Sequence, residues 1–242
     1  MTPLDIGGLR REFPDRRIDY YPSIDSTMRV AAALELREVV LAEEQTAGQG
    51  RHGHTWHSEA GSGIYCSLIV APAPVLTLAL GLAVVDSIAK STGIACDLRW
   101  PNDVMIADRK VAGILVQLSG AKAIAGIGIN VNHKWFPPEL AGEATALAEW
   151  RKPRGAPIPR EPIIAALLRA TDEYLAYDTP AILRLFTRSS SYAAGRRVEV
   201  QEADGVIRGV TAGLNPEGFL VVRRDDGTDT LIIAGGVRAA GS

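Results

Sequence analysis

The sequence has few cysteines, no long hydrophobic run and no excess of charge of one sign. Its two cysteines, Cys66 and Cys96, lie in apolar segments, so we expect buried thiols in a reducing, cytoplasmic setting rather than a disulfide. The longest apolar stretch, residues 72–85, is shorter than the roughly 18 apolar residues that span a bilayer, which excludes a membrane span. The first 17 residues have no apolar core, which excludes a secretory signal.

The charge balance argues against a nucleic-acid partner. The 242 residues contain 26 Lys and Arg against 28 Asp and Glu, a net charge of −2, so the basic excess that binds phosphate backbones is missing. With 47% hydrophobic and 22% charged residues, the composition is that of an ordinary globular protein. The length predicts one main domain with a small appendage.

The hydrophobic pattern predicts an α/β chain in which helices and short strands mix. Ser26 or Asp25 can cap a first helix, and Gly93 suits the left-handed cap that ends a later one. A tight turn at Asp108–Arg109 predicts a hairpin. The expected helices cover residues 26–36, 76–91, 162–177 and 180–186, and the expected strands residues 39–42, 64–70, 98–100, 104–107, 111–118 and 123–131.

The period changes near the C-terminus. From Arg197 onward short apolar strands alternate with turns at residues 204–205, 216–218 and 226–227, a pattern typical of small antiparallel sheets. We expect residues 195–242 to form a small barrel and residues 1–194 to form the main domain.

A glycine-rich segment at residues 48–63 is the first candidate for chemistry. Gly48 to Gly53 matches the dinucleotide pattern G-x-G-x-x-G literally, but the residues that follow are poor helix formers, so the nicotinamide-type interpretation fails on context. A plain surface loop is the other interpretation. Glycines let backbone amides approach phosphate oxygens, Arg51 adds a charged fork, and Trp56 can cover an apolar or aromatic ligand.

The same segment contains three of the four histidines. His52, His54 and His57 could bring two imidazoles to one metal ion. No cysteine lies near them, and solvated histidines in a polar loop are the more common case, so the sequence favours no zinc site.

A second cluster runs from Arg99 through Trp100 to Asp103 and continues at Lys110. Trp-Pro-Asn-Asp alone could be a turn capped by side chains. Lys110, however, begins a mostly apolar strand, where an ammonium group needs an anionic partner, and Gly113 leaves room for a ligand beside it.

Several motifs together resemble the biotin–protein ligase family, in matching order and spacing. They are Asp25-Ser26-Thr27, Glu44 to Arg51 with Trp56, Arg99 to Asp103, Lys110 to Leu115, and Gly126 to Asn132. The resemblance covers the chain from about Tyr20. It implies a mixed-sheet catalytic domain of the class II synthetase-like, biotin–lipoate ligase type, with residues 195–242 as an SH3-like β-barrel.

The resemblance also implies a two-step reaction. Biotin and MgATP give biotinyl-5′-AMP, and a lysine of a biotin carboxyl carrier protein of a biotin-dependent carboxylase then attacks it. Lys110 and Arg51 are the expected catalytic residues, because carboxylate and triphosphate must be brought together. The expected biotin site comprises Ser26, Thr27, Gln45, Gly48, Gln49, Lys110, Gly113 and Gly128. The expected nucleotide site comprises Arg51, Trp56, Asn102 and Asn130, with Asp103 as a Mg²⁺ ligand.

Three residues depart from the family pattern. Met28 replaces an asparagine often found after Ser-Thr, Gln49 stands where many members have arginine, and Arg99 replaces a lysine. The first removes a possible polar contact near biotin, the second loses one charge near the ligand, and the third keeps the charge but changes its geometry.

Some family members also act as repressors through an N-terminal helix-turn-helix domain. Only about 25 residues precede Ser26, so we expect a short form without repressor activity. Two other functions remain as alternatives: a lipoate or octanoate ligase or transferase of the same fold, and a catalytically silent biotin-binding module. An exposed strand edge could support a homodimer.

Overall fold

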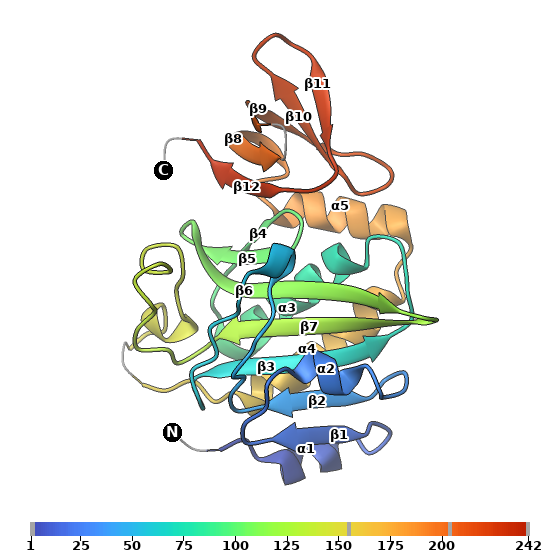
Figure 1. The fold of residues 1–242 in the computed structure, drawn as a ribbon, viewed down its shortest axis with the longest axis vertical. Helices are drawn as coiled ribbons and strands as arrows, with labels where there is room; N and C mark the ends of the chain where they lie inside the picture. Colours follow the sequence, from blue (N-terminus) through green and yellow to red (C-terminus); the bar gives the residue numbers. More distant parts are fainter. Residues whose placement is uncertain (1–2, 154–155, 203–204, 241–242) are drawn as a thin grey trace.

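A seven-stranded mixed sheet forms the centre of the molecule (Figure 1). The computed structural model describes residues 3–153, 156–202 and 205–240. The strand order is β1-β2-β3-β7-β6-β5-β4, in which β1 and β2 are parallel and every other neighbouring pair is antiparallel. The strands are β1 (Ile18–Tyr21), β2 (Val39–Ala42), β3 (Gly63–Val70), β4 (Asp97–Arg99), β5 (Asp103–Ile106), β6 (Arg109–Ser119) and β7 (Lys122–Asn130). The expected mixed α/β fold is therefore confirmed.

Two long helices cover one face of this sheet. α3 (Leu76–Thr92) and α4 (Glu161–Leu175) pack against each other and bury a core with Ile64, Leu68 and Ile127. α3 ends at Gly93, whose φ of 71° is the left-handed cap that its sequence predicted. α1 (Ile6–Glu12) and α5 (Thr179–Ser189) flank the pair, and two 3₁₀ turns lie at Arg51–Gly53 and Leu147–Glu149.

A short helix covers part of the opposite face. α2 (Thr27–Ala31) begins after Ser26 as expected but is only five residues long. The predicted extension to Leu36 is wrong, because the chain turns back at Arg37, which has a φ of 72°, to enter β2. The rest of this face is left open for the candidate site.

The C-terminal residues form a separate five-stranded antiparallel sheet in the order β11-β10-β9-β8-β12. The strands are β8 (Ala194–Glu202), β9 (Gly205–Leu214), β10 (Leu220–Arg224), β11 (Asp229–Ile232) and β12 (Gly236–Ala239). Figure 1 shows this sheet stacked beyond α5. The turn predicted at residues 204–205 lies partly outside the described residues, and closure into a barrel stays a prediction.

The C-terminal sheet contacts the main sheet through buried and charged groups. The indole Nε1 of Trp100 donates to the carbonyl of Gly218 at 2.9 Å. Asp108 accepts at 2.7 Å from Arg196 of β8, and also at 2.7 Å from the hydroxyl of Tyr192, which precedes β8. The Arg196 bond ties the C-terminal sheet to the hairpin that carries Lys110, and the Trp100 bond ties it to the turn between β4 and β5.

The hairpin turn between β5 and β6 lies one residue earlier than expected. Ala107 and Asp108 are its central residues, with φ of 47° and 60°, and Arg109 already belongs to β6. Positive φ at both central positions is the geometry that matches the twist of a two-residue hairpin.

The remaining expectations concern the cysteines and the membrane. Cys66 and Cys96 are both free, the first buried and the second half-buried. Across the described ranges, no helix has the length and apolar character needed to cross a membrane.

Candidate active site

Three glycines make a bare floor on the open face of the sheet. Gly113 of β6 pairs directly with Gly128 of β7, and Gly126 lies two residues before Gly128 on the same face of β7. A pocket lies over this floor, and any larger residue at these three positions would project its side chain into that space. The alternating glycines of β7 therefore let a ligand or a covering side chain reach the backbone.

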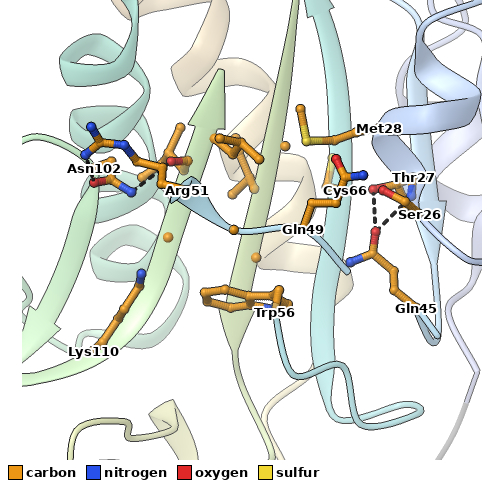
Figure 2. Close-up of a pocket in the computed structure, with 17 residues that line it drawn as sticks. Ser26, Thr27, Met28, Gln45, Gln49, Arg51, Trp56, Cys66, Asn102 and Lys110 are labelled. Atoms are coloured by element: carbon orange, nitrogen blue, oxygen red, sulfur yellow. Dashed lines mark hydrogen bonds between the residues drawn. The ribbon is translucent and has the colours of Figure 1, made fainter. Parts of the chain in front are cut away.

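A neutral polar group closes one end of the pocket (Figure 2). Gln45 Oε1 accepts from the backbone amide and the hydroxyl of Thr27, at 2.8 and 2.9 Å. The Thr27 hydroxyl in turn accepts from Ser67 at 2.8 Å. The Ser26 hydroxyl is buried and finds no hydrogen-bond partner among the described residues, so it is available to a ligand.

The glycine-rich segment folds as a hairpin that lays Trp56 on the floor. The Trp56 amide donates to the Gly48 carbonyl at 2.9 Å, and the Gly50 amide donates to His54 at 2.7 Å. A Cβ at Gly113 would lie 2.9 Å from the indole, and one at Gly128 would overlap it. The indole Nε1 is buried and unpaired within the described part of the chain.

A cationic cluster lies at the other end of the pocket. Lys110 Nζ lies 2.6 Å from Asp103 Oδ1 and 5.4 Å from the centre of the Trp56 ring. Arg99 binds the second oxygen of Asp103 at 2.8 Å. Burial alone would raise the pKa of Asp103, but Lys110 and Arg99 outweigh it and hold the pKa below its usual value. The anionic partner that Lys110 required is thus Asp103.

Arg51 reaches the same end from the tip of the hairpin. Its Nη1 donates to Asn102 Oδ1 at 2.9 Å, while Asn102 Nδ2 donates to the Ile114 carbonyl at 3.1 Å. Burial lowers the pKa of the Arg51 guanidinium, and the charge of Asp103 raises it in part; the group stays charged at neutral pH. Figure 2 shows Arg51, Asn102 and Lys110 on one side of Trp56, with Gln45 and Ser26 on the other.

The structure brings most of the predicted site residues together. The pocket lining includes Ser26, Thr27, Gln45, Gln49, Arg51, Trp56, Asn102, Lys110, Gly113 and Gly128. Gly48 lies beside it, where a Cβ would come within 2.7 Å of the Trp56 carbonyl oxygen. Asn130 is not part of the lining; it is buried at the end of β7, and its side chain donates to the Thr145 carbonyl at 3.2 Å.

Further lining residues were not predicted as site residues. They are Met28, Gly50, Cys66, Ile114, Leu115, Gly126 and Ile127. Gly126 could have been found, because the Gly-x-Gly alternation in an apolar strand signals close approach on one face. Leu115 and Ile127 look like ordinary core residues in the sequence, so no local signal marks them.

The described residues contain no group of three His, Cys, Asp or Glu side chains placed to hold a metal ion. Both oxygens of Asp103 face cations, Lys110 and Arg99, so its carboxylate fits an anchor for those groups better than a Mg²⁺ ligand.

The comparisons with known proteins agree with this geometry. Residues 20–133 match the family described as "Biotin/lipoate A/B protein ligase family". The chain is 32% identical to the Biotin--[acetyl-CoA-carboxylase] ligase of Mycobacterium tuberculosis over 97% of this chain and 94% of that protein. It is also 32% identical to the Bifunctional ligase/repressor BirA of Bacillus subtilis, over 91% of this chain and 73% of that protein.

A solved structure is similar as well. The biotin protein ligase from Aquifex aeolicus in complex with biotin and ATP superposes with a TM-score of 0.82 at 29% identity, covering 93% of this chain and 99% of that one. A bare glycine floor between a neutral polar end and a cationic end suits a ligand with a polar ring, an apolar tail and an acid group. On this sequence and structural evidence together, the chain belongs to the biotin–protein ligase family.

Proposed function

We propose that this protein attaches biotin to a lysine of a biotin carboxyl carrier protein in two ATP-dependent steps. A carboxylate oxygen of biotin attacks the α-phosphorus of ATP, and pyrophosphate leaves. The carrier lysine, as a neutral amine, then attacks the carbonyl carbon of biotinyl-5′-AMP; AMP leaves and the amide nitrogen loses its proton. The observation that supports this function best is one pocket with a neutral polar end and a cationic end, joined by the glycine floor. The neutral end matches the ureido ring of biotin, and the cationic end matches its carboxylate and the phosphates of ATP.

The neutral end suits the ring of biotin. Ser26, Thr27 and Gln45 offer hydroxyl and amide groups for its ureido atoms, and Gln49 lines the same pocket. Gly113 and Gly128 leave room for the aliphatic tail once the Trp56 indole that lies over them has shifted, and Gly48 lets the hairpin close over the tail. These roles are proposals for the residues predicted from the sequence.

The cationic end suits the reacting groups. The Lys110 ammonium is placed to bind the biotin carboxylate and the charge that develops at phosphorus, and Arg51 neutralises phosphate oxygens. Asn102 holds Arg51 in this position. Charge placement accounts for the first step without a covalent enzyme intermediate.

Magnesium enters this proposal with the nucleotide. Mg²⁺ is usually held by one or two carboxylates and by substrate phosphates, and when bound it would neutralise triphosphate charge. Because Asp103 is already paired with Lys110 and Arg99, we assign Asp103 to positioning these cations, and no step depends on its binding metal. Asn130 stays a predicted nucleotide contact outside the pocket lining.

The proposal extends to domains, setting and assembly. We infer a catalytic domain of residues 1–194 and a C-terminal SH3-like module of residues 195–242. We also infer a cytoplasmic setting, which is consistent with the free thiols of Cys66 and Cys96. Finally, we infer a homodimer that forms by strand pairing at β6. β5 pairs with β6 only as far as Gly113, which leaves the outer edge of residues 115–119 without a partner strand among the described elements.

Single-turnover transfer of radiolabelled biotin to a carrier domain tests the function. We expect labelling that requires ATP and the carrier lysine, and no comparable transfer of lipoate or octanoate. A lipoate ligase would reverse this preference, and a silent binding module would bind biotin without releasing pyrophosphate. Either result would overturn the proposed function.

A further inference from the structure

We propose that Met28 determines the size of the acid that the pocket accepts, by forming the wall at its ring-binding end. This inference rests on the proposed function and adds a specificity residue to it. Met28 replaces a polar residue common in the family, so its effect on the ligand is one of shape rather than hydrogen bonding.

Met28 lies directly on the glycine floor. It belongs to α2, lines the pocket beside Ser26 and Thr27, and is 5% exposed. A Cβ at Gly126 would lie 2.6 Å from the Met28 sulfur and 2.9 Å from its Cγ. The thioether therefore occupies the space that Gly126 leaves free, on the same face of β7 as Gly128.

Behind Met28 the molecule is apolar. Met28 belongs to a buried cluster that is separate from the main core and includes Leu34, Val40, Ile69 and Ile124. Met28 thus has two roles: it fills this cluster, and it ends the pocket. Shortening its side chain would extend the pocket toward the cluster, since close-packed surroundings collapse only partly onto a deleted side chain.

The polar groups next to Met28 can orient the ligand, so the remaining property that this wall can select is the size of the ligand. The Thr27 hydroxyl is already bonded to Gln45 and Ser67. Ser26 keeps an unpaired hydroxyl within the described residues, which can orient a polar ring. Met28 offers no hydrogen-bond donor, so it discriminates by contact alone, and contact with a group of methylene size changes specificity by about 10- to 200-fold.

The test compares Met28→Ala with the wild type. Adenylation is followed as pyrophosphate release with biotin and with two enlarged acids: biotin sulfone, which adds two oxygens at the ring sulfur, and biotin methylated on a ureido nitrogen. We expect Met28→Ala to raise kcat/KM for at least one enlarged acid, relative to biotin, by about tenfold or more.

Leu34→Ala is the matched control. Leu34 is buried in the same cluster but is not part of the pocket lining. It should lower the melting temperature to a similar extent as Met28→Ala while leaving the ratio of enlarged acid to biotin at the wild-type value. An equal change of that ratio in Leu34→Ala would assign the effect to general loosening and overturn the inference.

Gly126→Ala is a second variant that tests the same wall, because the added methyl group would contact the Met28 side chain. It replaces Met28→Ala as the test if Met28→Ala does not fold. Its methyl group should push the thioether into the pocket, raise KM for biotin, and sharpen discrimination against both enlarged acids. If the folded variants keep the wild-type ratio of kcat/KM for the enlarged acids to kcat/KM for biotin, while the wild type releases pyrophosphate with biotin, the inference about Met28 is overturned and the proposed function still holds. Absence of that release in the wild type would overturn the proposed function and this inference with it.

Discussion

At the residue scale, the proposed function makes Lys110 the group on which the first chemical step depends. Its ammonium is held between Asp103, at 2.6 Å, and the Trp56 ring, at 5.4 Å. Arg99 shares the same carboxylate, so Asp103 is not left without a cation when Lys110 is changed. The role of Lys110 can therefore be tested with a folded protein.

Lys110→Ala should lower the rate of adenylation by about 100-fold or more, and it should weaken biotin binding much less. The reason is that the ammonium faces charge that grows as the pentavalent phosphorus forms. Biotin affinity is measured by calorimetry and pyrophosphate release by a coupled assay. Lys90→Ala, which removes an exposed lysine on α3, is the control. Near-wild-type release from Lys110→Ala would remove Lys110 from this role.

His133 makes the stability of the protein depend on pH. It is buried and bonded through Nε2 to the Tyr65 hydroxyl at 3.2 Å, and it stacks on Phe136. Burial, with a smaller contribution from His57, lowers its pKa from 6.5 to about 4. The unfolded chain therefore takes up a proton near pH 6.5 that the folded protein does not take up until about pH 4.

The free energy of unfolding should consequently fall as the pH drops from 6.5 toward 4, with a contribution from His133 on the order of 3 kcal/mol. His133→Gln should lose this part of the acid dependence. Urea unfolding at pH 7 and at pH 5 measures the difference. An equal slope in both proteins would mean that His133 is not the group responsible.

At the element scale, the hairpin at residues 48–56 is the part of the site that must move. Trp56 lies flush on the glycine floor, so the tail of a ligand cannot lie on that floor until the indole shifts. Apart from Trp56, the segment buries little apolar surface, and its glycines keep its backbone entropy high. We expect the segment to be mobile in the free enzyme and ordered by ligand.

Trypsin cleavage after Arg51 should be fast in the free enzyme and much slower with biotin and MgATP. The adenylate supplies a phosphate for Arg51 and an apolar body for Trp56, and this offsets the entropic cost of ordering the loop. Cleavage at exposed arginines of the C-terminal sheet, followed in the same digests, controls for inhibition of the protease. Equal cutting after Arg51 in both conditions would contradict closure.

Arg51→Ala tests closure of the hairpin by a different measurement, since this variant lacks the arginine after which trypsin cuts. The variant should form some adenylate but release it faster, because the hairpin loses its charged contact to phosphate. Release is measured by chromatography in the absence of carrier. Retention equal to that of the wild type would show that the hairpin does not seal the pocket.

At the scale of the whole molecule, the C-terminal sheet supports one end of the main sheet. Trp100 is buried and bonded to Gly218, and Asp108 is held by Arg196 of β8. Deleting the chain after Gly195 should spare the secondary structure of the main domain but lower turnover and stability, because Trp100 is uncovered two residues before Asn102. Circular dichroism checks folding, and unchanged carrier biotinylation by residues 1–195 would contradict the expectation.

Much of the fold follows from local patterns, and the exceptions have physical reasons. α3 carries its own cap at Gly93 and was predicted to within a residue or two. β1 was missed because residues 18–21 are short, include Asp19, and are stabilised by parallel pairing with β2, which no local signal announces. α2 ends early because the entry into β2 requires a turn that apolar spacing does not reveal.

The site was predictable where residue type limits the chemistry. A lysine at the start of an apolar strand implied an anionic partner, and the hairpin provides it as Asp103. The identity of that partner depends on the register of β5 and β6, which includes an irregularity between Val104 and Met105. The contact of Trp56 with Gly113 and Gly128 likewise depends on tertiary packing, so sequence alone predicted a covering residue but not its resting place.

A crystal structure with a non-hydrolysable analogue of biotinyl-5′-AMP tests the central claim most directly. The account predicts that the ring lies against Ser26, Thr27 and Gln45, that the tail crosses Gly113 and Gly128 with the Trp56 indole lifted off the floor, and that the acyl-phosphate linkage lies within hydrogen-bond reach, about 3 Å, of Lys110 and Arg51. An analogue bound outside this pocket, or bound with its phosphate away from both Lys110 and Arg51, would contradict the account.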